Sequence, residues 1–459
     1  MKYTLRMTQN QSKDLHKYLF HDENESAMLG LCGFDLSQDE SLLLLHKLIP
    51  IPYELCERYP DFISWPTEFS EPFLEEALKN RLTIVKFHCH PGGYNQFSIT
   101  DDKSDKDLFD YYNAYFDDKR PVGSFVMLPD QTFFGRVILP NGKFIDVSKI
   151  AVIGKEQHYF YSTKLEIELP DYMVRNQQTF GKKTISQLQK MKVGVVGCSG
   201  LGTPTLLELA RSGIGELVLV DNKKIGKEHL NRMFGASIDD IGKYKVDFFK
   251  EKIAEYKLDV KVTAVVGDVT ESIEVLVALC FCDHIFGCTD GYLPRDVVNR
   301  LATYYIIGYT DMAMGLDADG NGGIDSIVGW VRYLIPGGSS LFTRGMYDSR
   351  DLERESLIKE NPEEYKKRQE QKYIKGANEK SPPVISLNAT VSSLGVTDFL
   401  NRIHPFKYKE ELGFCIDFCE NKIDTEPEYP DCPALVPNVG RGRVSPFLNL
   451  VGIGRKKAS

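Results

Sequence analysis

Two histidines and an aspartate stand in one short stretch of the chain, in an order typical of metal ligands. His88 and His90 follow the strand-like run 82–87, so their side chains should project from the same face of a strand. Asp101 comes after a short loop, next to a predicted helix over 103–116. Two imidazoles and a carboxylate with one open position suit a catalytic zinc, which lowers the pKa of a bound water to ~7.

Ser98 stands three residues before Asp101, and this pair has a second interpretation. Ser-x-x-Asp ahead of a helix is also a capping box, in which the two side chains satisfy backbone N–H groups of the first turn. Histidines in strands are, in addition, more often surface or core residues than metal ligands. Either half of the pattern alone is weak evidence, but the two halves in this order favour a metal-hydrolase site.

The combined spacing resembles the JAMM motif of the JAB/MPN metalloprotease family, with His-x-His-Pro followed by Ser-x-x-Asp. That family also has a glutamate on an early strand, in a Glu-x-x-x-x-Gly stretch that Glu25 to Gly30 match, with Glu23 as the alternative. The resemblance implies that the two histidines and Asp101 bind zinc. It further implies that Glu25 is the general base and that Ser98 stabilises the oxyanion.

Length and composition set limits on the whole chain. A chain of 459 residues with 42% hydrophobic content is expected to form two globular domains. Its net charge of −9 argues against non-specific binding to nucleic acid, which needs a cationic face. The ten cysteines lack the spacing of a secreted disulfide framework, and neither an apolar signal segment nor a membrane-length apolar run occurs. We therefore expect a cytoplasmic protein without membrane contact.

The order of predicted elements gives an α/β fold in both halves. Strands and helices alternate through the first 165 residues, and a proline-containing, acidic stretch then interrupts the pattern. The predicted domains are a JAB/MPN-type (cytidine-deaminase-like) α/β domain, a Rossmann-like adenylation domain with a mainly parallel sheet, and a basic tail. They cover residues 1–165, 171–437 and 438–459.

A glycine-rich turn marks the second half. A short helix over 186–191 and an apolar strand precede Gly197, Gly200 and Gly202, and a helix and a further strand that ends at Asp221 follow them. This order predicts phosphate at the helix N-terminus and the aspartate at the ribose hydroxyls. Because Ser199 replaces the middle glycine of the dinucleotide fingerprint, an NAD enzyme is not the preferred interpretation.

Charged residues downstream point to ATP instead of NAD. Asn231, Arg232 and Lys245 can contact and neutralise a triphosphate, and Asp290 follows a predicted strand, where a carboxylate can hold magnesium. Hydride transfer requires none of these groups.

This constellation resembles the ubiquitin-activating and ThiF/MoeB adenylyltransferases over about residues 171 to 405. The resemblance implies that Arg175 is an arginine finger, usually supplied by the other subunit of a homodimer. His229 and Met233 depart from the family's asparagine and glutamine. By the same resemblance the glycine turn, Asp221, Asn231, Arg232, Lys245 and Asp290 bind ATP and magnesium.

Most members of that family also carry two cysteine pairs that bind a structural zinc. Cys432 is the one matching thiol here, so we expect no zinc at that place. The acyl-accepting residue is equally open. The candidates are Cys415, Cys419, Cys432, Ser340 and Thr343, or direct transfer to a partner.

Both resemblances together predict a bifunctional enzyme: a zinc (iso)peptidase joined to an ATP-dependent adenylyltransferase. A ubiquitin-like protein is a substrate that both activities share, and a conjugating enzyme is a further expected partner. By resemblance, bacterial conjugation pathways, some of them antiphage, are the expected setting. Two alternatives stay open: activation and cleavage of a sulfur carrier, and a scaffold whose activating domain has decayed.

Overall fold

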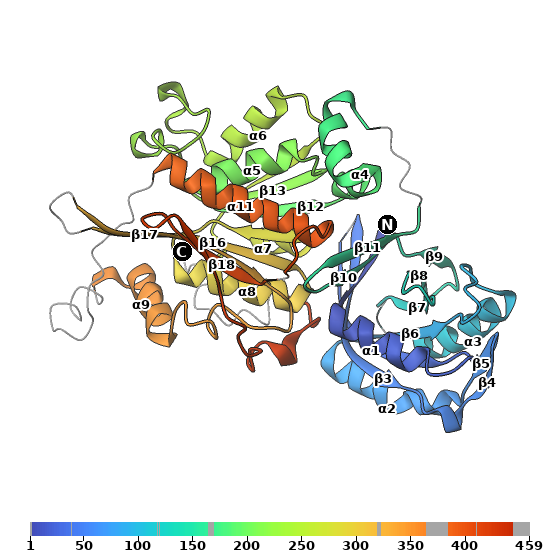
Figure 1. The fold of residues 1–459 in the computed structure, drawn as a ribbon. Helices are drawn as coiled ribbons and strands as arrows, with labels where there is room; N and C mark the ends of the chain where they lie inside the picture. Colours follow the sequence, from blue (N-terminus) through green and yellow to red (C-terminus); the bar gives the residue numbers. More distant parts are fainter. Residues whose placement is uncertain are drawn as a thin grey trace. The chain divides into compact units, whose positions relative to one another are not determined.

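The computed structural model of the protein contains two compact units (Figure 1). It describes residues 2–37, 39–116, 118, 120–163, 169–318, 323–363, 384–409 and 411–443. The first unit comprises the described parts of Met1–Glu166 together with Thr303–Ile306 and Pro437–Arg443, and the second comprises the rest. Among the described residues, no helix combines the length and the apolar character that crossing a membrane requires.

The first unit is built on a 9-stranded mixed sheet in the order β11-β10-β1-β3-β2-β6-β7-β8-β9. Its central strands β2 and β6 pair antiparallel, and β6 pairs with β7 in parallel. The elements are β1 (Lys2–Thr8), α1 (Gln9–Leu19), β2 (Ala27–Leu36), β3 (Glu40–Pro50), β4 (Glu57–Tyr59), β5 (Phe62–Ser64), α2 (Glu71–Asn80), β6 (Thr83–Cys89), α3 (Ile99–Tyr115), β7 (Val122–Met127), β8 (Phe133–Ile138), β9 (Phe144–Asp146), β10 (Lys149–Ile153) and β11 (Gln157–Tyr161).

Helices cover both faces of this sheet. Val85 and Phe87 of β6 belong to a core cluster that also contains side chains of α1, whereas Ile84 packs with side chains of α2 and α3. Because side chains alternate along a strand, Lys86 and His88 share the α2 and α3 face with Ile84. The fold therefore directs the first predicted metal ligand toward the helix that carries the third.

The second unit has an 8-stranded sheet in the order β14-β13-β12-β15-β16-β17-β18-β19. The strands from β14 to β16 run parallel, and β17 to β19 add antiparallel pairs. The elements are α4 (Val174–Leu188), β12 (Lys192–Val196), α5 (Gly202–Arg211), β13 (Glu216–Asp221), α6 (Lys245–Glu255), β14 (Lys261–Val266), α7 (Ile273–Cys280), β15 (His284–Gly287), α8 (Tyr292–Tyr305), β16 (Gly308–Ala318), β17 (Ile324–Leu334), α9 (Ser349–Glu360), α11 (Ile385–Ile403), β18 (Gly413–Asp417) and β19 (Lys422–Thr425).

The strand order places a topological switch between β12 and β15. The chain runs from β12 outward through β13 to β14, then returns to add β15 on the other side of β12. The carboxyl ends of two such strands diverge into a crevice, which is where open parallel sheets bind ligands. Helices α5 and α11 pack side by side near this end (Figure 1).

Several predicted elements differ from the structure at their ends. Helix α3 begins at Ile99 and not at residue 103, because the Ser98 side chain caps it there. The predicted helix over 186–191 is instead α4, which begins at Val174 and ends at Leu188, with a non-helical Gly181 at φ 78° inside it.

Two further differences concern the second unit. From the sequence, residues 331–336 are expected to form a strand, and they are the last part of β17, which begins at Ile324 and ends at Leu334, before Pro336. The charged sequence 351–380 is likewise expected to form a helix and a crossover loop; the helix is present as α9, whereas residues 364–383 lie outside the described part of the chain.

The predicted basic tail begins at residue 438, and its first residues lie with the first unit. The Gly33 N–H donates to Gly440 O at 3.1 Å, and His46 Nδ1 hydrogen-bonds with Val439 O at 2.7 Å. Residues 444–459 lie outside the described part, and the predicted domain limits remain predictions.

Candidate functional site

The first unit brings the three predicted metal ligands together. His88 lies in β6, His90 directly after it, and Asp101 in the first turn of α3. Their ligand atoms all lie within 4.8 Å of one another. The two Nε2 atoms are 3.2 Å apart, and they lie 3.1 and 3.4 Å from the Asp101 oxygens. The three side chains therefore converge on one point with the donor types that zinc prefers.

Both imidazoles are buried, and their second nitrogens differ. His90 Nδ1 lies 2.6 Å from Tyr94 O, so it carries the proton there and leaves Nε2 as a lone-pair donor. His88 Nδ1 is buried without a hydrogen-bond partner. Burial lowers the pKa of His88 to about 4, which keeps this ring neutral and able to act as a ligand at neutral pH.

Electrostatics keep the aspartate ionised beside the two rings. Burial opposes ionisation, but hydrogen bonds with His88 and His90 hold the pKa of Asp101 well below its usual value. Burial would lower the pKa of His90, and the hydrogen bonds to Asp101 and Tyr94 O raise it instead.

Glu25 is the glutamate that faces this cluster. It is 6% exposed, and its Oε1 lies 4.0 Å from His90 Nε2, whereas Glu23 is exposed. Its backbone lies in a loop just before β2 and not on a strand as expected, because its N–H donates to Tyr59 O and its carbonyl accepts from Arg58. Burial raises the pKa of Glu25 to about 7, a value suited to exchanging protons near neutral pH.

Ser98 performs the capping role that its sequence context also allows. Its Oγ accepts from Asp101 N at 3.0 Å and donates to Asp101 Oδ2 at 2.8 Å. Ser98 N donates to the same carboxylate oxygen at 2.7 Å. The capping box therefore fixes the orientation of the metal-ligand carboxylate, and the oxyanion role of Ser98 remains a prediction.

A buried charge network behind the cluster was missed by sequence reasoning. Asp105 is completely buried one helical turn after Asp101 and forms a short ion pair with Lys86 of β6. Arg136 of β8 donates to the same carboxylate at 3.0 and 2.7 Å. These contacts link the strand and the helix that carry the ligands. No spacing rule predicts them, because the partners are separated by 19 and 31 residues of sequence.

In the second unit, the glycine turn lies at the switch between β12 and β15. Gly197 has φ 94°, a left-handed conformation that glycine adopts freely. A Cβ on Gly202 would meet Gly197 O at 1.8 Å, so the turn has no room for a side chain there. Gly200 faces Asn388 of α11, a neighbour nearly 190 positions away that sequence reasoning did not find. The glycines therefore allow the backbone before α5 to turn tightly at the end of β12.

Asp221 and Lys245 form the charged part of this site. The Asp221 carboxylate accepts the Cys198 N–H at 2.9 Å and the Lys223 N–H at 2.8 Å. Lys245, the first residue of α6, is 2% exposed, and burial lowers its pKa while Asp221 opposes that shift. Asp221 and Arg232 both act electrostatically on Lys245, and the predicted nucleotide contacts of the three residues remain predictions.

The neighbouring predicted residues are more exposed. Asn231 lies on the surface, and Arg232 donates to Glu228 O at 2.6 Å. His229, which stands where the family has asparagine, is buried and accepts the Gly226 N–H at 2.8 Å through Nδ1. His229 is therefore a turn-forming residue in this structure.

The loop after β15 carries Asp290, and a buried arginine holds this loop. Arg295 donates to Thr289 O at 2.8 Å and to Asp311 Oδ2 at 2.9 Å. Sequence reasoning did not identify this arginine, since nothing local distinguishes it from a surface cation. Three hydroxyls around the glycine turn and this loop are buried without hydrogen-bond partners, those of Ser199, Thr203 and Thr289.

The remaining predicted residues lie in varied surroundings. Arg175 is exposed on α4 and donates to Gln178 of its own helix at 3.4 Å. Ser340 and Thr343 hydrogen-bond with each other in a turn. Of the candidate thiols, Cys432 is buried, Cys415 partly buried and Cys419 exposed.

Comparison with known proteins bears on the second unit. Residues 173–324 match the model of the ThiF family. These residues form a ThiF-like domain. The chain is 34% identical over 90 residues to the tRNA threonylcarbamoyladenosine dehydratase of Bacillus subtilis (strain 168), covering 20% of this chain and 35% of that protein. It is 31% identical over 114 residues to the sulfur carrier protein ThiS adenylyltransferase of Escherichia coli (strain K12), covering 25% and 45%.

Among solved structures, a crystal structure of E. coli MccB with MccA-N7isoASN is 20% identical at a TM-score of 0.45, covering 59% of this chain and 75% of that one. The matched part of the chain spans less than half of the B. subtilis dehydratase and less than half of the E. coli adenylyltransferase. The JAB/MPN likeness of residues 1–165 remains a prediction.

Proposed function

We propose that the second unit uses ATP and magnesium to adenylate the C-terminal carboxylate of a ubiquitin-like protein. The observation that carries this proposal is the glycine turn beside Asp221 and Lys245, within the residues that match the ThiF family. A resemblance to an enzyme that adenylates the sulfur carrier ThiS supports a small protein as the substrate.

The residues present fit a nucleotide. Backbone N–H groups at the α5 N-terminus would receive phosphate, and the three unpartnered hydroxyls of Ser199, Thr203 and Thr289 supply unused hydrogen-bonding groups at the same place. In the reaction, a carboxylate oxygen bonds to the α-phosphorus of ATP and the bond to the β-phosphate oxygen breaks. Pyrophosphate leaves, and Lys245 and Arg232 would neutralise its charge. Asp290 would hold magnesium, and Arg175 of a second copy would complete the site in a homodimer.

We further propose that the first unit is a zinc-dependent (iso)peptidase that cleaves the tail of the same ubiquitin-like protein. The convergence of His88, His90 and Asp101 supports it, since this donor set fits zinc. When bound, zinc would supply Lewis-acid chemistry. Glu25, with its pKa near 7, would accept a proton from the attacking water and return it to the leaving amine.

The two proposed activities would share one substrate. Cleavage exposes a C-terminal carboxylate, and an activating site on the same chain then meets that carboxylate at a raised effective concentration. A conjugating enzyme as the next partner, the acyl-accepting residue and an antiphage setting remain predictions of the resemblance, and the cytoplasmic location remains a prediction from the sequence.

Adenylation is tested by incubating the protein with ATP, magnesium and a ubiquitin-like protein encoded beside it, with detection of pyrophosphate and of the acyl-adenylate by mass spectrometry. We expect both products, and we expect Asp290→Asn to suppress them about 10²–10³-fold. Thiocarboxylate formation without target conjugates would favour sulfur-carrier activation. Pyrophosphate release that does not depend on Asp290 would contradict the proposed site.

Cleavage is tested on the same protein with an extra C-terminal tail. We expect zinc-dependent release of the tail, lost in Glu25→Gln and retained in Glu23→Gln, because only the former side chain faces the ligand cluster. Equal loss in both variants would contradict the assignment of the base.

A further inference from the structure

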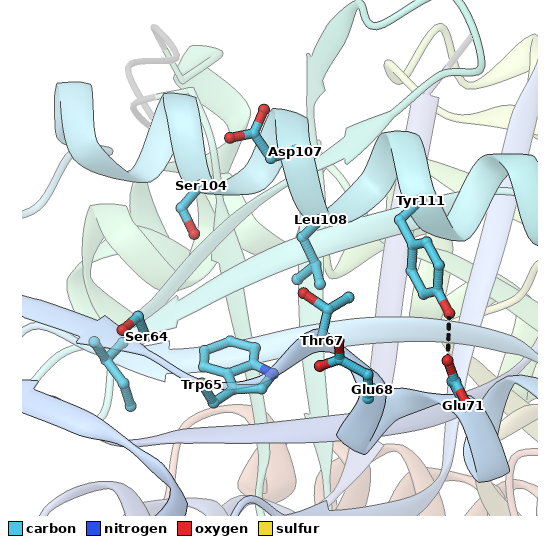
Figure 2. Close-up of a pocket in the computed structure, with 10 residues that line it drawn as sticks. Ser64, Trp65, Thr67, Glu68, Glu71, Ser104, Asp107, Leu108 and Tyr111 are labelled. Carbon is cyan, nitrogen blue, oxygen red and sulfur yellow. Dashed lines mark hydrogen bonds between the residues drawn. The ribbon is translucent and has the colours of Figure 1, made fainter.

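A cavity of about 450 Å³ opens in the first unit between α3 and the segment that leads from β5 into α2. Figure 2 shows Ser104, Leu108 and Tyr111 on the helix above it and Trp65 below it. The volume lies within the roughly 300–1,000 Å³ of small-ligand pockets. None of the residues that line the cavity belongs to the metal-ligand cluster.

The lining of this cavity carries charge of one sign. Glu68, Glu71 and Asp107 contribute carboxylates, and none of the ten lining residues is basic. Glu71 is partly engaged, because it accepts the Tyr111 hydroxyl at 3.2 Å, whereas Glu68 and Asp107 are exposed at the rim. Aromatic side chains between the acids provide faces that attract a cation.

A second observation is a hydrogen-bond donor beside the cavity that has no acceptor. The Trp65 indole nitrogen is buried and has no hydrogen-bond acceptor, and in Figure 2 it lies on the side of Thr67 and Glu68. An N–H without an acceptor is costly when it is shielded from water. An occupant that combines a cation with a carbonyl oxygen would satisfy both the acids and the indole. A peptide segment with a basic residue has this chemistry.

The helix relates the cavity to the metal-ligand cluster. Ser104, Leu108 and Tyr111 follow Asp101 at spacings of three, four and three residues, which places all four on one side of α3. At 1.5 Å per residue, the cavity begins about 5 Å and ends about 15 Å along the helix from Asp101. An extended peptide covers that span with about two to five residues.

We propose that this cavity is a subsite for a lysine or arginine side chain of the polypeptide that reaches the metal-ligand cluster. The ammonium or guanidinium group lies beside Glu68 and Glu71, its aliphatic stem packs on Trp65, and a peptide carbonyl accepts the indole N–H. The substrate class rests on the proposed peptidase function, whereas occupancy of the cavity does not require cleavage.

The test measures binding through the tryptophans. The chain has two, Trp65 and Trp330, so 5-fluorotryptophan labelling gives two ¹⁹F resonances that Trp65→Phe assigns. The probe is the peptide acetyl-Ala-Lys-Ala-Lys-Ala-amide, and its control has norleucine in place of lysine. We expect the lysine peptide to shift the Trp65 resonance saturably and to leave Trp330, in the second unit, unchanged. A Trp65 resonance that does not move overturns the proposal, as does an equal response to the norleucine peptide.

Matched charge variants locate the interaction. Glu68→Gln with Glu71→Gln should weaken binding of the lysine peptide about tenfold. Glu75→Gln with Asp110→Asn removes the same charge from exposed positions on α2 and α3 outside the cavity and should leave the affinity within about twofold. Equal weakening in both pairs would mean that net charge, and not the cavity, attracts the peptide. A protein that binds the peptide but cleaves no tail retains this inference and contradicts the peptidase function.

Discussion

The metal-ligand cluster of the first unit and the glycine turn of the second are built from different parts of the chain. Side-chain atoms of His88, His90 and Asp101 already touch one another, with buried charges packed behind them. At the turn, the glycines lack side chains, so the shape of the site is set by backbone atoms, with the charged residues nearby. The first site should therefore respond mainly to changes of functional group, and the second also to added volume.

The largest expected effect is the loss of the metal site. Replacing His88 and His90 by alanine removes two of the three converging donors, so metal content measured by atomic emission after dialysis against zinc should fall to background. Pyrophosphate release by the second unit is the internal control and should persist. Stoichiometric zinc retained by the double variant would place the metal elsewhere.

Next in size is the buried charge behind the ligands. Asp105→Asn leaves Lys86 without a charged partner and Arg136 with only the more exposed Asp102, which should cost about 3–5 kcal/mol of unfolding free energy. The matched change Asp102→Asn affects a carboxylate that is 52% exposed and should cost about 0–1 kcal/mol. Urea denaturation of both variants, monitored by hydrogen exchange in β6 and α3, measures the two losses of unfolding free energy. Similar losses in the two variants would show that the buried ion pairs stabilise the fold no more than the exposed one does.

A methyl group tests the second site without removing any functional group. Gly202→Ala places a Cβ against backbone at Gly197 O, and because the turn must shift, ATP affinity should fall at least about tenfold. Gly200→Ala meets only the Asn388 side chain at 3.0 Å, which can move, and should have a smaller effect. Isothermal titration with ATP and magnesium measures both, and an unchanged affinity in Gly202→Ala would break the contrast between the sites.

The smallest effect concerns Ser98. Loss of its cap in Ser98→Ala should cost about 0.5–2 kcal/mol of stability, and Ser98→Gly less, because a cap contributes that much. Peptidase rates distinguish the second role: a fall of about 10²–10³-fold in kcat, beyond the stability loss, would support the predicted oxyanion contact. A rate unchanged in a folded Ser98→Ala would leave capping as the only role.

Local sequence patterns predicted much of what the structure shows. Strand periodicity predicted that His88 and His90 project from the same face, and the strand, turn and helix around Gly197 to Gly202 have the predicted order. The errors lie at element ends, such as the start of α3 and the loop conformation of Glu25. Caps and single loop hydrogen bonds decide those ends, and a periodic pattern does not report them.

The sequence by itself determined which residue types were available and which faces of their elements they occupy, because side-chain period and turn chemistry are local properties of the backbone. Only the tertiary structure decided that Asp105 neutralises Lys86, that Arg295 holds the Asp290 loop and that Asn388 faces Gly200. It also decided the acidic cavity beside α3. Such contacts join residues far apart in the chain, and they form only when packed sheets and helices bring those residues within reach.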